Sequence, residues 1–156
     1  MGRKVIRVFV DSNVILSGFL SERGAAPILL DLLSLRLPFL IGSTGRYNLI
    51  EIERNLKKKM PSLLCLYKAY LPKLNLRVIS LPRPEEVRDF SGQIAEEDIP
   101  VLISAIHSKA DFLVTGDKQH FGKMKELDKY PFHVVTASEF TDSILPEILK
   151  GLEEKE

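Results

Sequence analysis

Two aspartates come directly after apolar runs that are typical of buried strands. Asp11 follows Val5 to Val10, and Asp117 follows Phe112 to Thr115 after one glycine. β-Branched and aromatic residues favour strands, so each aspartate is expected where a strand ends. The carboxyl ends of parallel strands share one edge of a sheet, and ligands of α/β proteins bind there. The spacing therefore predicts that two carboxylates from distant parts of the chain meet at one edge.

Asp98 is a third candidate, at the start of a helix predicted over 98–107. It shares a stripe of that helix with Leu102, Ala105 and Ile106, so it begins a face that otherwise looks buried. A buried charge without a partner is unfavourable, and a helix N-terminus or a metal ion supplies such a partner. Asp98 therefore fits the same site as the strand-end aspartates.

A fourth carboxylate is expected from the helix that runs to about residue 59. Glu51 and Glu53 are both candidates. Glu53 lies nearer the apolar stripe of that helix, whereas Glu51 shares its stripe with Asn48 and Asn55. Helical periodicity alone does not choose between the two glutamates.

A cluster of carboxylates favours metal chemistry. Like charges raise one another's pKa, so several carboxylates cannot all stay ionised together without a cation. Oxygen ligands suit Mg²⁺ or Mn²⁺ rather than zinc, and a single cysteine with three scattered histidines gives no zinc-type spacing. One ion can lower the pKa of a bound water, and a second, roughly 4 Å away, can stabilise the leaving oxygen of an in-line displacement.

Each of these residues also has an ordinary structural explanation. Asp11 fits a turn after a strand, Asp98 fits a helix N-cap, Asp117 fits a Gly-Asp turn, and the glutamate fits a solvated helix face. Singly, these explanations are at least as good as a catalytic role. Together, the convergence of two strand ends and one helix start on one edge favours a site. Asn13 and Thr115, beside the strand ends, fit a supporting role or plain turn chemistry about equally well.

Strands and helices alternate along the chain. Strands are predicted at 5–10, 38–41, 76–80, 111–115 and 133–135, and helices at 13–20, 26–35, 44–59, 61–71, 98–107, 118–127 and 138–149. Ser43 or Thr44 is expected to cap the third helix, and the proline-rich segment 81–93 is expected to be a surface connection. The alternation predicts a single three-layer α/β/α domain with a mostly parallel central sheet over 1–150, followed by a charged tail at 151–156.

The composition fits a cytoplasmic globular protein. The chain has 156 residues, of which 45% are hydrophobic and 28% charged, and its net charge is +1. Cys65 is the single cysteine, so no internal disulfide is possible, and a reducing compartment is expected. No apolar stretch reaches membrane-spanning length, and the first apolar run is too short for a signal peptide. With so small a net charge, any contact with nucleic acid must come from a local basic patch.

The acidic positions lie in segments that resemble the motifs of the PIN-domain family. Val8 to Ser17 resembles the family's opening strand, which ends in Asp-Thr-Asn or Asp-Ser-Asn. Asp98 with Val101 to Ala105, and then Ala110 to Lys118, resemble its third and fourth acidic motifs, and Ala-Asp-Phe-Leu-Val-Thr-Gly-Asp is the most specific part. Val134 to Phe140 resembles the closing strand and helix of a subgroup, the VapC-like ribonucleases that form the toxin components of toxin–antitoxin pairs. The likeness spans roughly residues 4 to 145.

This resemblance implies a Mg²⁺- or Mn²⁺-dependent endoribonuclease whose acidic site falls on Asp11, Glu51, Asp98 and Asp117. Glu51 matches the family's helix motif because Leu49 stands two positions before it and Ile52 follows it. The segment 42–47 departs from the family's pattern, since it contains glycines and is slightly longer, and this keeps Glu53 as the alternative. The resemblance also implies an RNA substrate, a small antitoxin that blocks the acidic cleft, and a homodimer.

Basic residues follow Glu51 on the same helix. The candidates for contacts with RNA phosphates are Arg54, Lys57, Lys58 and, beside the fourth motif, Lys118. Tyr67 and Tyr70 are interleaved with further basic residues and are candidates for stacking on bases. Because the net charge is only +1, a solvated helix face with core tyrosines is the favoured interpretation for most of these residues.

Two other functions compete with a nuclease. Phosphatases of the haloacid dehalogenase type also place an aspartate after the first strand, but they normally have a second aspartate two positions on, where this chain has Asn13. A non-catalytic RNA- or protein-binding module of PIN-like fold is the second alternative. An acidic residue at each position of the family's motif favours the enzyme over such a module.

Overall fold

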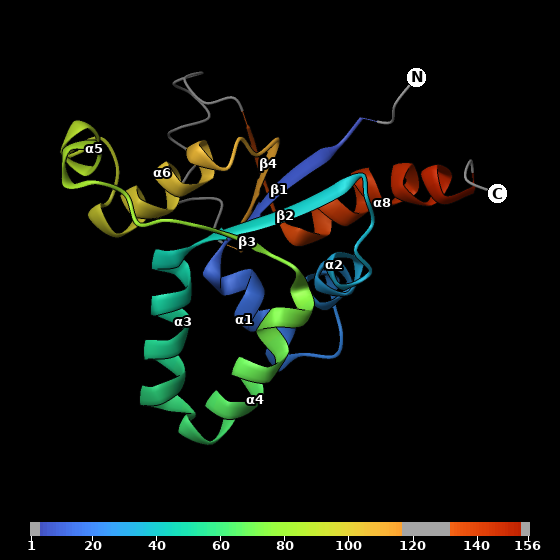
Figure 1. The fold of residues 1–156 in the computed structure, drawn as a ribbon, viewed down its shortest axis with the longest axis horizontal. Coiled ribbons are helices and arrows are strands. Elements are labelled where there is room, and N and C mark those ends of the chain that lie inside the picture. Colours follow the sequence, from blue (N-terminus) through green and yellow to red (C-terminus); the bar gives the residue numbers. More distant parts are fainter. Residues whose placement is uncertain (1–3, 117–131, 154–156) are drawn as a thin grey trace.

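Five strands form one parallel sheet in the computed structural model, which describes residues 4–116 and 132–153 (Figure 1). The strands are β1 (Ile6–Val10), β2 (Leu40–Gly45), β3 (Arg77–Ile79), β4 (Phe112–Val114) and β5 (His133–Val135). Their order across the sheet is β3-β2-β1-β4-β5, and every pairing is parallel. The order reverses at β1, and in such sheets the ligand site lies beside that point.

Helices connect the strands at nearly all of the predicted positions. They are α1 (Ser12–Leu20), α2 (Ala25–Ser34), α3 (Arg46–Lys59), α4 (Leu64–Tyr70), α5 (Pro84–Asp89), α6 (Ile99–His107) and α8 (Ala137–Glu153), with 3-10 turns η1 (Pro61–Leu63), η2 (Leu71–Leu74) and η3 (Glu96–Asp98). The helix predicted over 118–127 lies outside the described residues. None of the described helices is long and apolar enough to cross a membrane.

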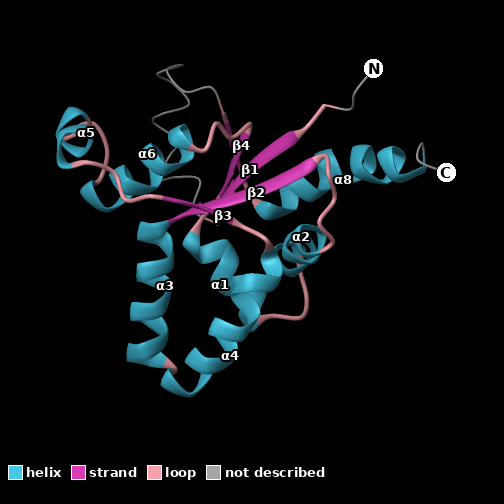
Figure 2. Ribbon diagram, viewed as in Figure 1, coloured by secondary structure: helices cyan, strands magenta, loops and turns pink. Residues whose placement is uncertain are grey.

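Alternate residues of β1 face two separate cores, as the pleat of a strand requires. Val8 and Val10 pack into the larger core, which α1, α2, α3 and α8 also line. Phe9 packs into the other core against α6, in register with Leu113 and Val134 of the neighbouring strands. Figure 2 shows α1 and α6 on opposite sides of the sheet. The predicted three-layer α/β/α fold is confirmed.

The second strand is longer than predicted, and the predicted helix cap is wrong. Ser43 and Thr44 lie inside β2, and Gly45 occupies the N-cap position of α3. The Ser43 hydroxyl donates to the Val8 carbonyl at 3.4 Å, and the Thr44 hydroxyl donates to the Val10 carbonyl at 2.8 Å. These hydroxyls therefore bond the backbone of the adjacent strand rather than the first turn of a helix.

The segment predicted as a surface connection contains the short helix α5. Its first turn is held by Glu86, whose Oε1 accepts from the Arg83 backbone N–H at 3.1 Å. The Oε2 atom of Glu86 lies 2.6 Å from Nε2 of His107, which ties α5 to the end of α6. The charged and proline-rich composition did not indicate this helix. Its stabilising contacts come from a capping residue and from a histidine distant in the sequence.

Tyr67 has no exposed surface, so it cannot stack on RNA bases. Its ring packs edge-to-face on Phe19 with the centroids 5.7 Å apart. Its hydroxyl has no hydrogen-bond partner among the described residues. Burial raises the pKa of the phenol well above its ordinary value, and the charge of Glu53 raises it further.

Replacing Tyr67 by phenylalanine is expected to increase the free energy of unfolding by about 1 kcal/mol, because it removes a buried hydroxyl with no partner. The native pKa lies above the unfolded value of 10.0, so wild-type stability is complete below pH 10.0 and declines above it. The variant should lose less stability over that alkaline range. Denaturant unfolding at neutral pH and above pH 10.0 measures both effects.

Tyr70→Phe is the matched control, because Tyr70 is only partly buried and contacts the same Phe19 ring, with the centroids 5.3 Å apart. It should change neutral-pH stability less than Tyr67→Phe does. A loss of stability in Tyr67→Phe would show that the hydroxyl has a favourable partner.

Candidate active site

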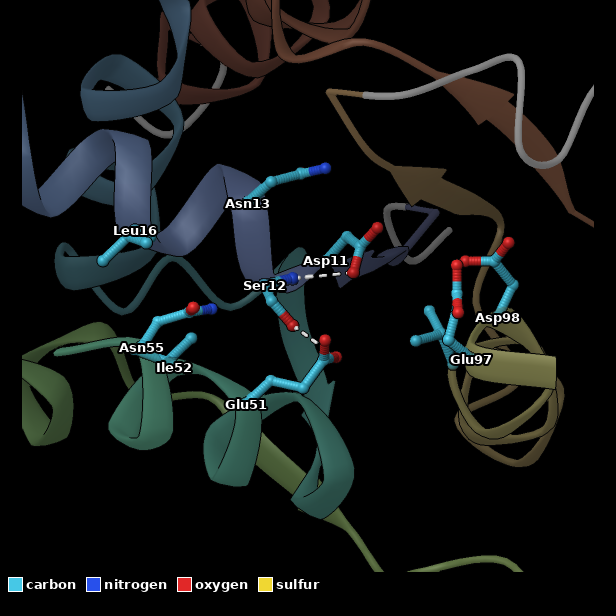
Figure 3. A pocket seen from close by; sticks show the side chains of 10 residues that line it. Asp11, Ser12, Asn13, Leu16, Glu51, Ile52, Asn55, Glu97 and Asp98 are labelled. Atoms are coloured by element: carbon cyan, nitrogen blue, oxygen red, sulfur yellow. Dashed lines mark hydrogen bonds between the residues drawn. The ribbon is translucent and has the colours of Figure 1, made fainter. Parts of the chain in front are cut away.

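A cleft of about 440 Å³ opens beyond the carboxyl end of β1, between α1, α3 and the turn that leads into α6 (Figure 3). Its polar lining comes from Asp11, Ser12, Asn13, Glu51, Asn55, Glu97 and Asp98, and its apolar lining from Leu16, Ile52 and Val101. In Figure 3 Asp11 lies between Glu51 on one side and the pair Glu97 and Asp98 on the other. The structure thus brings three of the four predicted carboxylates to one opening.

Asp11 is held from three directions and is only 9% exposed. Its backbone N–H donates to the Val114 carbonyl at 2.9 Å, which fixes the end of β1 to the end of β4. Its Oδ1 accepts from the Ser12 backbone N–H at 2.7 Å and from Asn48 Nδ2 at 3.0 Å. Its Oδ2 accepts from the Thr115 hydroxyl at 2.8 Å. The bond from Ser12 caps α1, whereas the bonds from Asn48 and Thr115 come from other parts of the fold.

Burial raises the pKa of Asp11, and the nearby charge of Asp98 raises it further, while hydrogen bonds from Thr115, Ser12 and Asn48 act in the opposite direction. Burial also raises the pKa of Glu51, followed by the charge of Asp11 and then that of Asp98. These carboxylates therefore repel one another across the cleft. A divalent cation would relieve that repulsion, and their oxygens are the ligands that Mg²⁺ and Mn²⁺ prefer.

Asp98 occupies the N-cap position of α6, but among the described residues its side chain makes no capping hydrogen bond. It is only 9% exposed and lines the cleft. The geometry therefore does not support the ordinary N-cap explanation for Asp98. The charge of Asp98 instead acts on Asp11 across the cleft.

The two glutamates of α3 point in different directions. Glu51 lines the cleft, and its Oε1 accepts from the Ser12 hydroxyl at 3.3 Å. Glu53 lies close enough to Tyr67 to raise the pKa of that phenol, on the side of α3 away from the cleft lining. Leu49, Ile52 and Leu56 of α3 are buried, and Glu51 and Asn55 on the neighbouring stripe line the cleft.

Asn13 and Thr115 join the ends of β1 and β4. The Asn13 Oδ1 accepts from the Gly116 backbone N–H at 2.9 Å, and its Nδ2 lies 3.5 Å from the Thr115 hydroxyl oxygen. Thr115 has no exposed surface and donates to Asp11. The predicted fourth carboxylate, Asp117, lies outside the described residues.

Within residues 4–116 and 132–153, no three acidic, histidine or cysteine side chains stand close enough to hold one metal ion together. Asp11, Glu51 and Asp98 nevertheless line one opening, and burial together with their mutual repulsion raises the pKa values of Asp11 and Glu51, which a hard cation would offset. The donor set therefore fits Mg²⁺ or Mn²⁺ in its chemistry.

Glu97 and Asn48 are two of the site residues that were not among the predicted ones. Glu97 lines the cleft beside Asp98, and the acidic run Glu96 to Asp98 before the helix was the available signal. Asn48 is completely buried and bonds Asp11, and its place on the same stripe as Glu51 was the signal there.

The predicted phosphate-binding residues of α3 are exposed. Arg54 lies near the cleft, since its charge lowers the pKa of Glu51. Lys57 and Lys58 belong to the last turn of α3, where cations also offset the helix dipole. Lys118 lies outside the described residues.

Comparison with known proteins gives a match to the family model of the PIN domain over residues 7–119. No curated protein matches the chain. Among solved structures, the fold is similar to VapBC2 from Rickettsia felis bound to a DNA fragment from their promoter, with 15% identity, a TM-score of 0.58, and coverage of 83% of this chain and 97% of that one.

Two further structures are similar at comparable levels. FitAcB from Neisseria gonorrhoeae has 17% identity and a TM-score of 0.57, and the match covers 83% of this chain and 97% of that one. VapBC-1 from nontypeable Haemophilus influenzae has 13% identity and a TM-score of 0.58, with coverage of 85% and 99%. The family model spans most of the chain, and the fold agrees with it. The chain belongs to the PIN domain family.

Proposed function

We propose that the protein is a Mg²⁺- or Mn²⁺-dependent endoribonuclease that cuts RNA at the acidic cleft. One observation carries the proposal, which is that Asp11, Glu51 and Asp98, from separate parts of the chain, line one opening beyond the carboxyl end of β1. Asp117 completes the acidic set on the strength of its sequence motif. The raised pKa values of Asp11 and Glu51 support a site built for a cation, because a purely structural cluster gains nothing from repulsion.

These carboxylates would hold the ion, and the surrounding residues would hold the carboxylates. When bound, a divalent cation lowers the pKa of a water molecule and stabilises charge on the leaving oxygen of a phosphodiester. Thr115, Ser12 and Asn48 fix the orientation of Asp11 through hydrogen bonds. Asn13 links the start of α1 to the residue that follows Thr115, through the Gly116 backbone N–H.

The partners follow from the same assignment. The sequence resemblance to toxin components, together with the likeness in fold to VapBC2 and FitAcB, supports the toxin of a toxin–antitoxin pair. We therefore propose an RNA substrate, a small antitoxin that covers the acidic cleft, a homodimeric state and a cytoplasmic location. Arg54, Lys57, Lys58 and Lys118 are proposed to contact the RNA backbone, and the charge of Arg54 acts on Glu51 in the cleft.

A pair of isosteric variants tests the site. Glu51→Gln is expected to slow cleavage of single-stranded and transfer RNA in Mn²⁺ by about 10²-fold or more, because it removes a charge from the cleft. Glu53→Gln is the matched control on the same helix and should cut at about the wild-type rate. The initial rates of product formation on denaturing gels measure both.

Equal losses in the two variants, or none in either, would contradict the assignment of Glu51. If a folded wild type cut no RNA but hydrolysed a chromogenic phosphate monoester, the phosphatase alternative would replace the nuclease. Failure on both substrates, with RNA still bound, would favour the non-catalytic module.

A further inference from the structure

Asn48 is a polar side chain with no exposed surface, in the first turn of α3. Its amide nitrogen donates to two acceptors, Asp11 Oδ1 at 3.0 Å and Ser12 Oγ at 2.8 Å. An amide NH₂ group has two hydrogens, so both are used. The side chain thus binds both the last residue before α1, Asp11, and the first residue of that helix, Ser12.

The Ser12 hydroxyl extends this bridge to a second carboxylate. Ser12 Oγ accepts from Asn48, so the Ser12 hydroxyl hydrogen is available to Glu51 Oε1 at 3.3 Å. The backbone carbonyl of Asn48, at 3.4 Å, is a longer alternative acceptor. A single amide and a single hydroxyl therefore connect Asp11 and Glu51, which come from different elements. Figure 3 shows Ser12 between these two carboxylates.

Packing alone does not explain an asparagine at this position. Its Oδ1 is buried and has no hydrogen-bond partner among the described residues, which is unfavourable. That oxygen lies against Gly45, where an added Cβ would come within 2.7 Å of it. An apolar side chain would avoid the unpaired oxygen. Exchanging the amide atoms would not help, since Oδ1 would then face the Asp11 carboxylate.

We propose that Asn48 is a positioning residue that holds the Asp11 carboxylate, and through Ser12 the Glu51 carboxylate, in the orientation that they present to the cleft. Three of the roughly four lone-pair positions of the Asp11 carboxylate are occupied by Ser12, Asn48 and Thr115. Rotation of the carboxylate would therefore break hydrogen bonds. The consequence for cation binding rests on the proposed function, whereas the positioning contact itself does not.

The first arm of the test uses the metal. Asn48→Ala is expected to weaken Mn²⁺ binding, measured by titration calorimetry on the folded protein, by roughly 10–100-fold, as loss of a residue that orients a ligand does. Its kcat for RNA should fall while its KM stays near that of the wild type. Thr141→Val is the matched control, because it removes a different buried polar group, a hydroxyl that donates to the Ser138 carbonyl within α8 and does not line the cleft. This control should leave the Kd for Mn²⁺ unchanged.

The second arm needs no metal and no activity. In the metal-free wild type, the Asn48 side-chain amide protons should exchange slowly with water in NMR spectra, because both are bonded and buried. Asp11→Ala should speed that exchange, since it removes one acceptor.

The outcomes separate the two proposals. Slow amide exchange in the wild type, together with a raised Kd for Mn²⁺ in folded Asn48→Ala, supports the positioning role. Fast exchange of the Asn48 amide protons in the wild type overturns that role, and so does an unchanged Kd for Mn²⁺ in Asn48→Ala. If the wild type neither binds Mn²⁺ nor cuts RNA, the proposed function fails, and the exchange rate alone then decides whether Asn48 holds Asp11.

Discussion

Asp11→Asn is expected to slow RNA cleavage by about 10²–10³-fold while the protein stays folded. The substitution keeps the shape of the side chain, and Oδ1 can still accept from Ser12 and Asn48. The new amide faces the Thr115 hydroxyl, which can rotate and accept instead of donating. What is lost is the negative charge of a buried carboxylate that lines the cleft. Cleavage assays measure the loss of activity, and circular dichroism measures whether the variant stays folded.

The same variant should unfold at a higher temperature than the wild type when no metal is present. Burial and the charge of Asp98 raise the native pKa of Asp11 above its ordinary value of 3.8. A raised native pKa means that wild-type stability is complete below pH 3.8 and declines as pH rises through the native value. Asp11→Asn removes that decline. Melting curves in chelator across the acidic range should therefore diverge as pH rises.

Asp111→Asn is the matched control, because Asp111 precedes β4 at the opposite end from the cleft and accepts from the Arg7 backbone N–H at 2.8 Å. It should cut RNA at about the wild-type rate. If Asp11→Asn unfolds, or if it cuts as fast as Asp111→Asn, Asp11 is a structural residue and the proposed mechanism fails.

Removal of divalent metal is expected to abolish cleavage in the wild type, and its return should restore the activity. The charge of Asp11 raises the pKa of Glu51, and among the described residues that line the cleft there is no lysine or arginine. A ligand that binds only the native state stabilises it by mass action, by about 2.7 kcal/mol at a hundred times the Kd. For a domain of this size that corresponds to a rise in Tm of roughly 5–10 °C.

Thermal melts with Mn²⁺, Mg²⁺ and chelator measure this effect, and Asp11→Asn should show a much smaller shift than the wild type. An unchanged Tm at millimolar metal, from a wild type that is folded, would argue against a formed cation site. Cleavage that persists in excess chelator would show that the acidic cluster acts without a metal.

The sequence by itself indicated the alternation of strands and helices and the place of two of the cleft carboxylates. The apolar run that ends at Asp11 and the one that ends at Thr115 form β1 and β4 as predicted, because a fully buried strand must be apolar along its length. Position at the end of a strand is a local property, so the place of Asp11 at the sheet edge follows from neighbouring residues. Asp98 follows in the same way from its place at the start of an amphipathic helix.

The tertiary structure alone decided which polar residues bond across elements. Ser43 and Thr44 look like helix caps in the sequence, but the carbonyls that accept from them belong to β1. Such partners lie more than thirty positions away in the chain, and no local pattern indicates them.

The choice between Glu51 and Glu53 depended on the same kind of information. Both glutamates suit an α-helix, and only the rotation of α3 against the core, fixed by the packing of its apolar stripe, directs Glu51 to Ser12 and the cleft. That rotation also buries Asn48 beside Asp11. The sequence therefore determined where the carboxylates enter the fold, and long-range packing decided which of them share an opening, because helix orientation is set by contacts that no stretch of sequence contains.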